Sequence, residues 1–183
     1  MSASSPPLAL ETWEIASAMR KQHRLDVGIA QDMLRQTGNI EPMCVLITPD
    51  GKRNAVVIPG IGQPESKDAS YAALAQLAAK LRAVGLSLLT EAWMRFVKRR
   101  QGESKRAFEE RISIPVREFE DRLEVLQVFT CWRGSEGDVR SLSTTREIRR
   151  DAKGDVIGFG DLDQNEIEST EARVAQCLPR LAP

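Results

Sequence analysis

Glu91 is the residue in this sequence whose type and setting most invite a catalytic interpretation. It is the one acid in the run LSLLTEAWMRFV. A catalytic carboxylate needs a second acid, a base or a metal beside it, and no other acid has a fixed spacing to Glu91. On a strand it would lie opposite an arginine such as Arg146 or Arg133, so we expect half of an ion pair. Hydrolysis by Glu91 with acids from 109–124 stays open as a weaker alternative.

His23 and the three cysteines limit the other chemistry. A single histidine, in the polar stretch KQHR, excludes a His-rich metal site and favours a solvent-exposed side chain. Cys44, Cys131 and Cys177 are widely spaced and lack a C-x-x-C pair, which argues against disulfides, zinc ribbons and thioredoxin-like redox chemistry. Cys44 and Cys131 are expected in the core. The sequence therefore predicts no catalytic residue, no metal and no cofactor.

Clustered basic residues give the most pronounced functional pattern. Six of them lie between 95 and 106 against one acid, and a second basic group lies between 140 and 153. If the two groups form one surface, it could hold a phosphate backbone. The residues concerned are Arg95, Lys98, Arg99, Arg100, Lys105, Arg106, Arg140, Arg146, Arg149, Arg150 and Lys153. Residues 107–124 carry six acids against three arginines, and alternating charge blocks of this kind also suit self-association.

Overall composition argues against several function classes. The 183 residues carry 26 basic and 26 acidic side chains, so zero net charge and a pI of about 6.6 give no general attraction to nucleic acid or anionic membranes. Hydrophobic content of 42% is ordinary for one globular domain. No apolar run approaches a bilayer span and MSASSPPLALE has no leader pattern. We therefore expect a cytoplasmic protein without membrane contact.

Turn and capping residues divide the chain into regions. Residues 1–9 are rich in Ser, Pro and Ala and are expected to be disordered. Residues 10–37 are predicted to form a helical arm of two helices, the second capped by Asp26 and stopped at Gly38. Residues 38–183 are predicted to form a single α+β domain.

Hydrophobic patterns within that domain predict a sheet. MCVLITPDGKRNAVVIP indicates a hairpin of strands 43–48 and 54–58, and a helix is expected from Lys67 to Val84. A charged connection is expected at 98–122, a closing helix at 165–178, and further strands at 86–97, 123–132, 139–150 and 156–160. The predicted fold is a single mixed or mainly antiparallel sheet with one long helix packed on it, an N-terminal helical arm and a C-terminal helix.

The strand over 123–132 is apolar on both alternating faces, which is typical of a central strand covered on both sides. One helix covers only one face, so the arm either packs on its own sheet or crosses onto a second subunit, and we expect a homodimer. Strand 86–97 is expected to turn Leu88, Thr90, Ala92, Met94 and Phe96 to the core. One core beneath helix 67–84 should contain Leu74, Leu77, Leu81, Leu88, Val125, Leu126, Val128 and Phe129.

The order VLITPDGKRNAVVIP, helix, LLTEAWM resembles a class of small uncharacterised bacterial and phage α+β proteins. In these a hairpin with a D-G turn, here Asp50 and Gly51, precedes a helix and a strand with an E-A-W signature, here Glu91 to Trp93. IPVREFEDR, at 114–122, is similar as well. The resemblance covers about residues 40–150 and implies a fold of the kind described above, with no activity attached.

The sequence therefore favours a non-enzymatic protein–protein interaction or assembly domain that forms a homo-oligomer. Its partner is not indicated by any motif. The alternative is a nucleic-acid-associated accessory protein that uses the two basic groups at 95–106 and 140–153.

Overall fold

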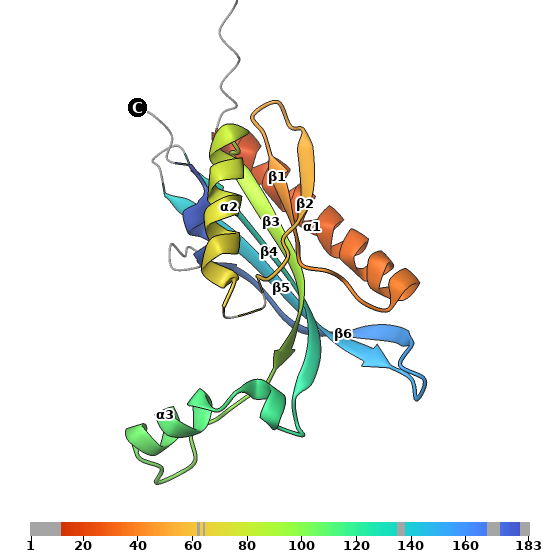
Figure 1. Ribbon diagram of the computed structural model, residues 1–183, viewed down its shortest axis with the longest axis vertical. Coiled ribbons are helices and arrows are strands. Elements are labelled where there is room, and N and C mark those ends of the chain that lie inside the picture. The colour runs from red at the N-terminus through yellow and green to blue at the C-terminus, as the bar shows by residue number, and fades with distance from the viewer. Residues whose placement is uncertain (1–11, 62, 64, 135–137, 168–172, 180–183) are drawn as a thin grey trace, which may run out of the picture.

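One antiparallel sheet organises the chain (Figure 1). The computed structural model describes residues 12–61, 63, 65–134, 138–167 and 173–179, and within these ranges the sheet has six strands. Their order across the sheet is β2 (Arg53–Val57), β1 (Met43–Ile47), β3 (Gly85–Met94), β4 (Leu123–Arg133), β5 (Val139–Arg150) and β6 (Val156–Ile167). The predicted α+β class is confirmed, with the strand of 123–133 inside the sheet. The segment 1–9, predicted to be disordered, lies outside the described residues.

Helix α1 (Thr12–Thr37) covers one face of this sheet. Its apolar side chains Val27, Ala30 and Leu34 pack against Leu89 of β3 and Leu126 of β4. The segment predicted as an arm of two helices is thus one helix that lies on its own sheet. It ends where Gly38 adopts a φ of 76° and donates its N–H to the Leu34 carbonyl at 2.9 Å.

The predicted break at Asp26 is wrong for a physical reason. Asp26 is a favourable N-cap type, but here its carboxylate is fully buried and accepts hydrogen bonds from Gln22 and Arg53. Gln22 lies one turn earlier on the same helix, and Arg53 lies on β2. Because the Asp26 carboxylate is bound to these side chains, it does not cap a helix, and α1 continues through Asp26.

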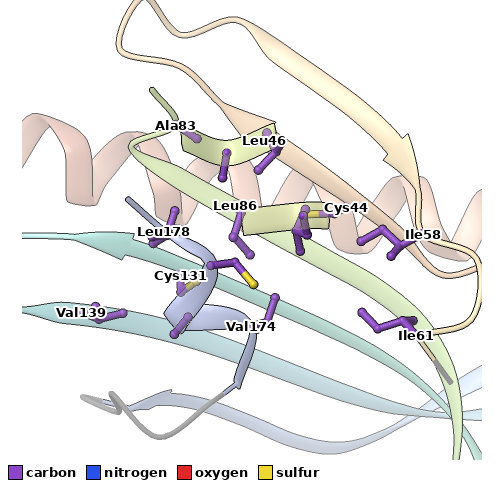
Figure 2. Packing of buried hydrophobic residues seen from close by; sticks show 14 residues of the cluster. Cys44, Leu46, Ile58, Ile61, Ala83, Leu86, Cys131, Val139, Val174 and Leu178 are labelled. Carbon is purple, nitrogen blue, oxygen red and sulfur yellow. The ribbon is translucent and has the colours of Figure 1, made fainter. Parts of the chain in front are cut away.

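Helix α2 (Lys67–Lys80) and the 3-10 helix η2 (Arg173–Cys177) cover the opposite face. Figure 2 shows the apolar cluster beneath them, in which Cys44, Leu46, Leu86 and Cys131 of the sheet meet Val174 and Leu178. Helix α2 stops earlier than the predicted Val84. The reason is Arg82, which has a φ of 51°, while the next amide, that of Ala83, donates to the Ala78 carbonyl at 2.9 Å.

The prediction of one core beneath helix 67–84 is corrected, because buried apolar clusters lie on both faces of the sheet. Leu74, Leu77, Leu81, Leu88 and Phe129 do belong to the cluster on the α2 face. Leu126 and Val128, however, point to the other face and pack under α1. Strand β3 behaves in the same way, because Ser87 and Leu89 lie on the face opposite the one expected to turn to the core, yet both are fully buried under α1. Both faces of the first half of β3 are therefore interior.

The C-terminal part differs from prediction in its boundaries. The strand predicted over 156–160 extends to Ile167, because β6 pairs along β5 as far as Ser141↔Ile167 and supplies that strand with a second neighbour. Within the described part of the segment predicted as a closing helix, residues 165–167 belong to β6 and residues 173–177 form η2. Residues 168–172 lie outside the described part of the chain.

Candidate interaction surface and buried polar clusters

The connection between β3 and β4 extends away from the rest of the molecule. Figure 1 shows α3 (Lys105–Ser113) at the far end of this extension, well separated from α1 and α2. We call residues 93–122 the projection; it contains the end of β3, helix α3 and the 3-10 helix η1 (Val116–Glu118). The sequence predicted a charged connection here without a helix. Helix α3 begins after Ser104, whose side chain accepts a hydrogen bond from the Ala107 amide at 3.1 Å.

Ion pairs and ring contacts brace the projection internally. Arg111 donates to both carboxylate oxygens of Glu103, at 2.8 and 2.9 Å, and to the Lys98 carbonyl at 2.9 Å. Hydrogen bonds from Arg111 hold the pKa of Glu103 well below its usual range, at about 2. At the base, the Arg95 guanidinium lies 3.7 Å from the centre of the Phe119 ring. A bidentate arginine and a stacked arginine together give this segment a defined shape.

Apolar side chains are concentrated on the outside of the projection. Seven large hydrophobic side chains are exposed within the described residues, and four of them lie on this segment: Trp93, Phe96, Ile112 and Ile114. Phe96 is 62% exposed, next to the exposed Lys98 and Arg99. Single exposed apolar residues are ordinary on a protein surface, but a group of them marks a contact surface.

Most of the basic residues predicted as a nucleic-acid contact are engaged within the chain. In the projection, Arg95 pairs with Asp121 at 2.7 Å, in the geometry of an ion pair and not of a linear hydrogen bond. The other contacts join Lys105 to Glu109, Arg106 to Glu110, and Arg99 to the Glu103 carbonyl.

The second basic group does not complete one surface with the first. Arg140 pairs with Trp132 in the sheet register, whereas Arg150 lies at the other end of β5, near the start of β4. The four arginines of this strand also have acidic neighbours, in the pairs Arg140–Asp138, Arg146–Asp161, Arg149–Glu147 and Arg150–Glu124. The second group is therefore spread along the length of β5, and its charge is partly compensated locally.

Glu91 lies in a tightly connected ion cluster. One of its carboxylate oxygens accepts the Ile40 amide, and the other lies 3.9 Å from Arg150. Its pKa is raised, mainly by burial and in part by the neighbouring Glu124. Arg150 holds Glu124 through two hydrogen bonds of 2.6 and 2.8 Å and also donates to the Gly38 carbonyl at 2.8 Å. The expected ion pair is present, with Arg150 as partner in place of Arg146 or Arg133.

The shared guanidinium decides how the Glu91 cluster behaves chemically. Two carboxylates close together can exchange a proton when neither is neutralised, as in acid–base catalysis. Here a single arginine lies between them and also ties the α1–β1 connection to β4 and β5. The arrangement is that of a structural tie that joins distant segments of the chain.

His23 is buried, contrary to the prediction of a solvent-exposed side chain. Its ring nitrogens contact Thr130 at 2.8 Å and Thr144 at 2.7 Å, and Thr130 in turn contacts Ser87 at 2.7 Å. Ser87 and Thr130 are fully buried beneath α1, so neither hydroxyl can meet a substrate. Burial is also the main cause that lowers the pKa of His23. This chain of hydroxyls and imidazole contains the nucleophile and base types of a catalytic triad, but it has no carboxylate, and its Ser87 and Thr130 hydroxyls are buried.

The spacing of His23 and Asp26 in the sequence indicates that both are buried, although their polarity alone favours exposure. Met19, His23, Asp26, Ala30 and Leu34 recur at helical spacing of three and four residues, on the buried face of α1. Polar residues inside an apolar stripe must find partners in the core, and these two do so on β2, β4 and β5.

The cysteines are structural. All three are buried with free thiols in the cluster on the α2 face, so Cys177, expected to be more exposed, is interior too. Burial raises the pKa of Cys177 to about 11 and raises that of Cys44 and Cys131 as well. Across the described ranges, no group of three or more His, Cys, Asp or Glu side chains is arranged to hold a metal ion.

Comparison with known proteins gives no relative. No family model, curated protein or solved structure matches this chain. In the part of the chain described by the structure, none of the helices combines the length and apolarity needed to cross a membrane. The surfaces of the molecule itself are therefore the guide to its function.

Proposed function

We propose that this protein is a non-enzymatic assembly module that associates with a second copy of itself through the projection, residues 93–122. The observation that carries the proposal is the concentration of exposed Trp93, Phe96, Ile112 and Ile114 on one braced, extended segment. Covering exposed apolar side chains with a partner surface is favourable by about 25 cal/mol per Å² of area removed from water.

The shape of the projection suits binding. Internal pairs such as Arg111–Glu103 fix the segment before a partner arrives, which lowers the entropy lost on association. The segment also has the roughly 20–30 residues that one side of a standard interface requires. Helix α1 does not compete for this role, because its apolar face is already buried on its own sheet.

Charge favours a second copy over an unrelated protein. The first half of the projection is basic at 95–106, and the following segment 107–124 carries six acids against three arginines. In a dimer with a twofold axis every contact between the two copies occurs twice. The basic half of each projection can therefore contact the acidic half of the other. The exposed pairs within α3, Lys105–Glu109 and Arg106–Glu110, are weak enough to exchange for such contacts.

Nucleic acid is less well supported as the partner. Its phosphates would compete with the acids that already contact Arg95, Lys105 and Arg106. Of the two exposed aromatic rings on the projection, Trp93 already has the Arg122 guanidinium 4.8 Å from its ring centre, which leaves Phe96 for base stacking.

Light scattering after size exclusion, over a wide range of protein concentration, tests the proposal. We expect a dimer whose dissociation constant rises about tenfold or more in Ile112→Ser and in Phe96→Ser. The matched control is Leu25→Ser, since Leu25 and Ile112 are both 49% exposed and Leu25 lies on α1. Added salt should weaken the dimer, because part of the contact is between charges. A protein that is monomeric at every concentration, or equal effects of the three variants, would overturn the proposal.

A further inference from the structure

A cleft between α1 and β5 lies apart from the projection. It has a volume of about 300 Å³. Five residues of α1 and two of β5 line it: His23, Arg24, Val27, Gly28, Gln31, Thr144 and Arg146. The volume is at the lower end of the range for small-molecule sites. None of the lining side chains is acidic, although the chain as a whole has equal numbers of acids and bases.

Gly28 has no structural explanation within the chain. It lies in the interior of a 26-residue helix, where glycine is less favourable than alanine. A Cβ atom at this position would meet nothing within 4 Å, so packing does not exclude a side chain. Because Gly28 lines the cleft, the absence of a side chain at this position makes the cleft wider.

Two arginines supply positive charge from opposite sides of the cleft. Arg146 of β5 contacts Asp161 at 3.3 Å through its terminal nitrogen, and the side chain of Asp161 is 85% exposed. The Nε of Arg146 is buried without a hydrogen-bond partner. Arg24 of α1 has no ion pair with any residue in the described ranges. Guanidinium groups match the oxygens of phosphate and carboxylate groups.

The floor of the cleft is rigid. His23 and Thr144 are both buried and contact each other at 2.7 Å, which fixes the side chains beneath the arginines. Gln31 adds an amide that can donate a hydrogen bond. A site that combines a fixed floor, convergent donors and open width is suited to a ligand with one anionic end.

We propose that this cleft binds a small molecule through a phosphate or carboxylate oxyanion held between Arg24 and Arg146. The proposal does not depend on the projection, because no residue of the cleft lies there. The oxyanion can belong to a phosphorylated or to a carboxylated compound, because guanidinium and amide donors bind the oxygens of both groups.

The single histidine provides a direct probe. His23 lines the cleft and is the only histidine in the chain, so the imidazole spectrum of untagged, ¹⁵N-labelled protein contains one set of signals. We titrate inorganic phosphate and, in a separate arm, acetate, each against sodium chloride at equal ionic strength. We expect the His23 signals to shift in a saturable way with one of the two oxyanions and not with chloride. The oxyanion that saturates shows whether the ligand carries a phosphate or a carboxylate.

Matched variants locate the binding. Arg146→Gln should weaken the responding oxyanion about tenfold or more, whereas Arg149→Gln, on the same strand but outside the cleft, should leave its affinity unchanged. Gly28→Leu should abolish binding by filling the cleft, while Gly28→Ala should raise the melting temperature through its better helix propensity. Thermal melting checks that each variant is folded. Absence of a saturable shift in the wild type, or unchanged affinity in folded Arg146→Gln and Gly28→Leu, would refute the proposal.

Discussion

The two faces of the sheet are covered by helices in chemically different ways. On the α2 face the contact is made by carbon and sulfur, with Leu46, Leu86 and the thiols of Cys44 and Cys131 at its centre. On the α1 face, buried polar groups interrupt an apolar contact, and His23 and Asp26 reach hydroxyls and a guanidinium on the sheet. Both faces are equally interior.

Because of this difference, the position of α1 on the sheet is fixed more precisely than the position of α2. Apolar contacts depend on area and volume, so a helix held by them alone can shift with a modest change in free energy. Hydrogen bonds depend on distance and direction, and a buried polar group that loses its partner costs about 1–3 kcal/mol. His23 bonded to β4 and β5, and Asp26 bonded to β2, therefore fix the position of α1 across most of the sheet.

The largest expected effect tests whether the α1 face is as much a part of the core as the α2 face. Leu34→Ala and Leu74→Ala each remove a buried leucine, one from each face, so each should lower the free energy of unfolding by about 2–5 kcal/mol. Urea unfolding measures both. The half-buried Leu81 serves as the control, and Leu81→Ala should cost about 1 kcal/mol. A Leu34→Ala protein that unfolds like wild type would mean that α1 is a detachable arm.

The second prediction concerns the polar ties of α1. Asp26→Ala leaves Gln22 and Arg53 without their carboxylate partner and opens a small buried space. Because Arg53 is partly exposed, we expect a loss of about 1–3 kcal/mol, below that for a fully buried pair. Asp32→Ala is the matched control on the same helix, where an exposed pair with Arg35 should contribute less than about 0.5 kcal/mol. Equal losses in the two variants would remove the proposed difference between the faces.

Local signals account for what the sequence revealed. The Asp50–Gly51 turn, the apolar alternation of β4 and the glycine that ends α1 each operate over a few residues, and each was predicted. The roles of His23 and Asp26 depend on partners that are 107, 121 and 27 residues away. The charge blocks around residue 100 were visible as well, but not that they lie on a projection, because that depends on how far β3 and β4 extend beyond the helices.

The same contrast appears in the response to pH. Burial, and to a lesser extent Arg24, lowers the pKa of His23 from 6.5, while Asp26 acts in the opposite direction. The folded protein therefore keeps His23 neutral at a pH where the unfolded chain has bound a proton. Stability then falls as pH decreases below about 6.5 and stops falling once the pH has passed the folded pKa. The thiols of the α2 face have raised pKa values and stay neutral throughout this range.

We accordingly expect the free energy of unfolding to fall by up to about 1.4 kcal/mol per pH unit through this one group as the pH decreases below 6.5. Urea unfolding at a series of pH values from about 7.5 to 5.5 measures the slope, in a range above the titration of ordinary carboxylates. In His23→Gln the side chain does not titrate and keeps one hydrogen bond, so the slope should flatten although the protein is less stable at neutral pH. The Cys131→Ala variant, altered on the other face, should retain the wild-type slope. If wild type and His23→Gln lose stability in parallel, the imidazole titrates alike in the folded and unfolded chain. Its burial between Thr130 and Thr144 would then not describe the protein in solution.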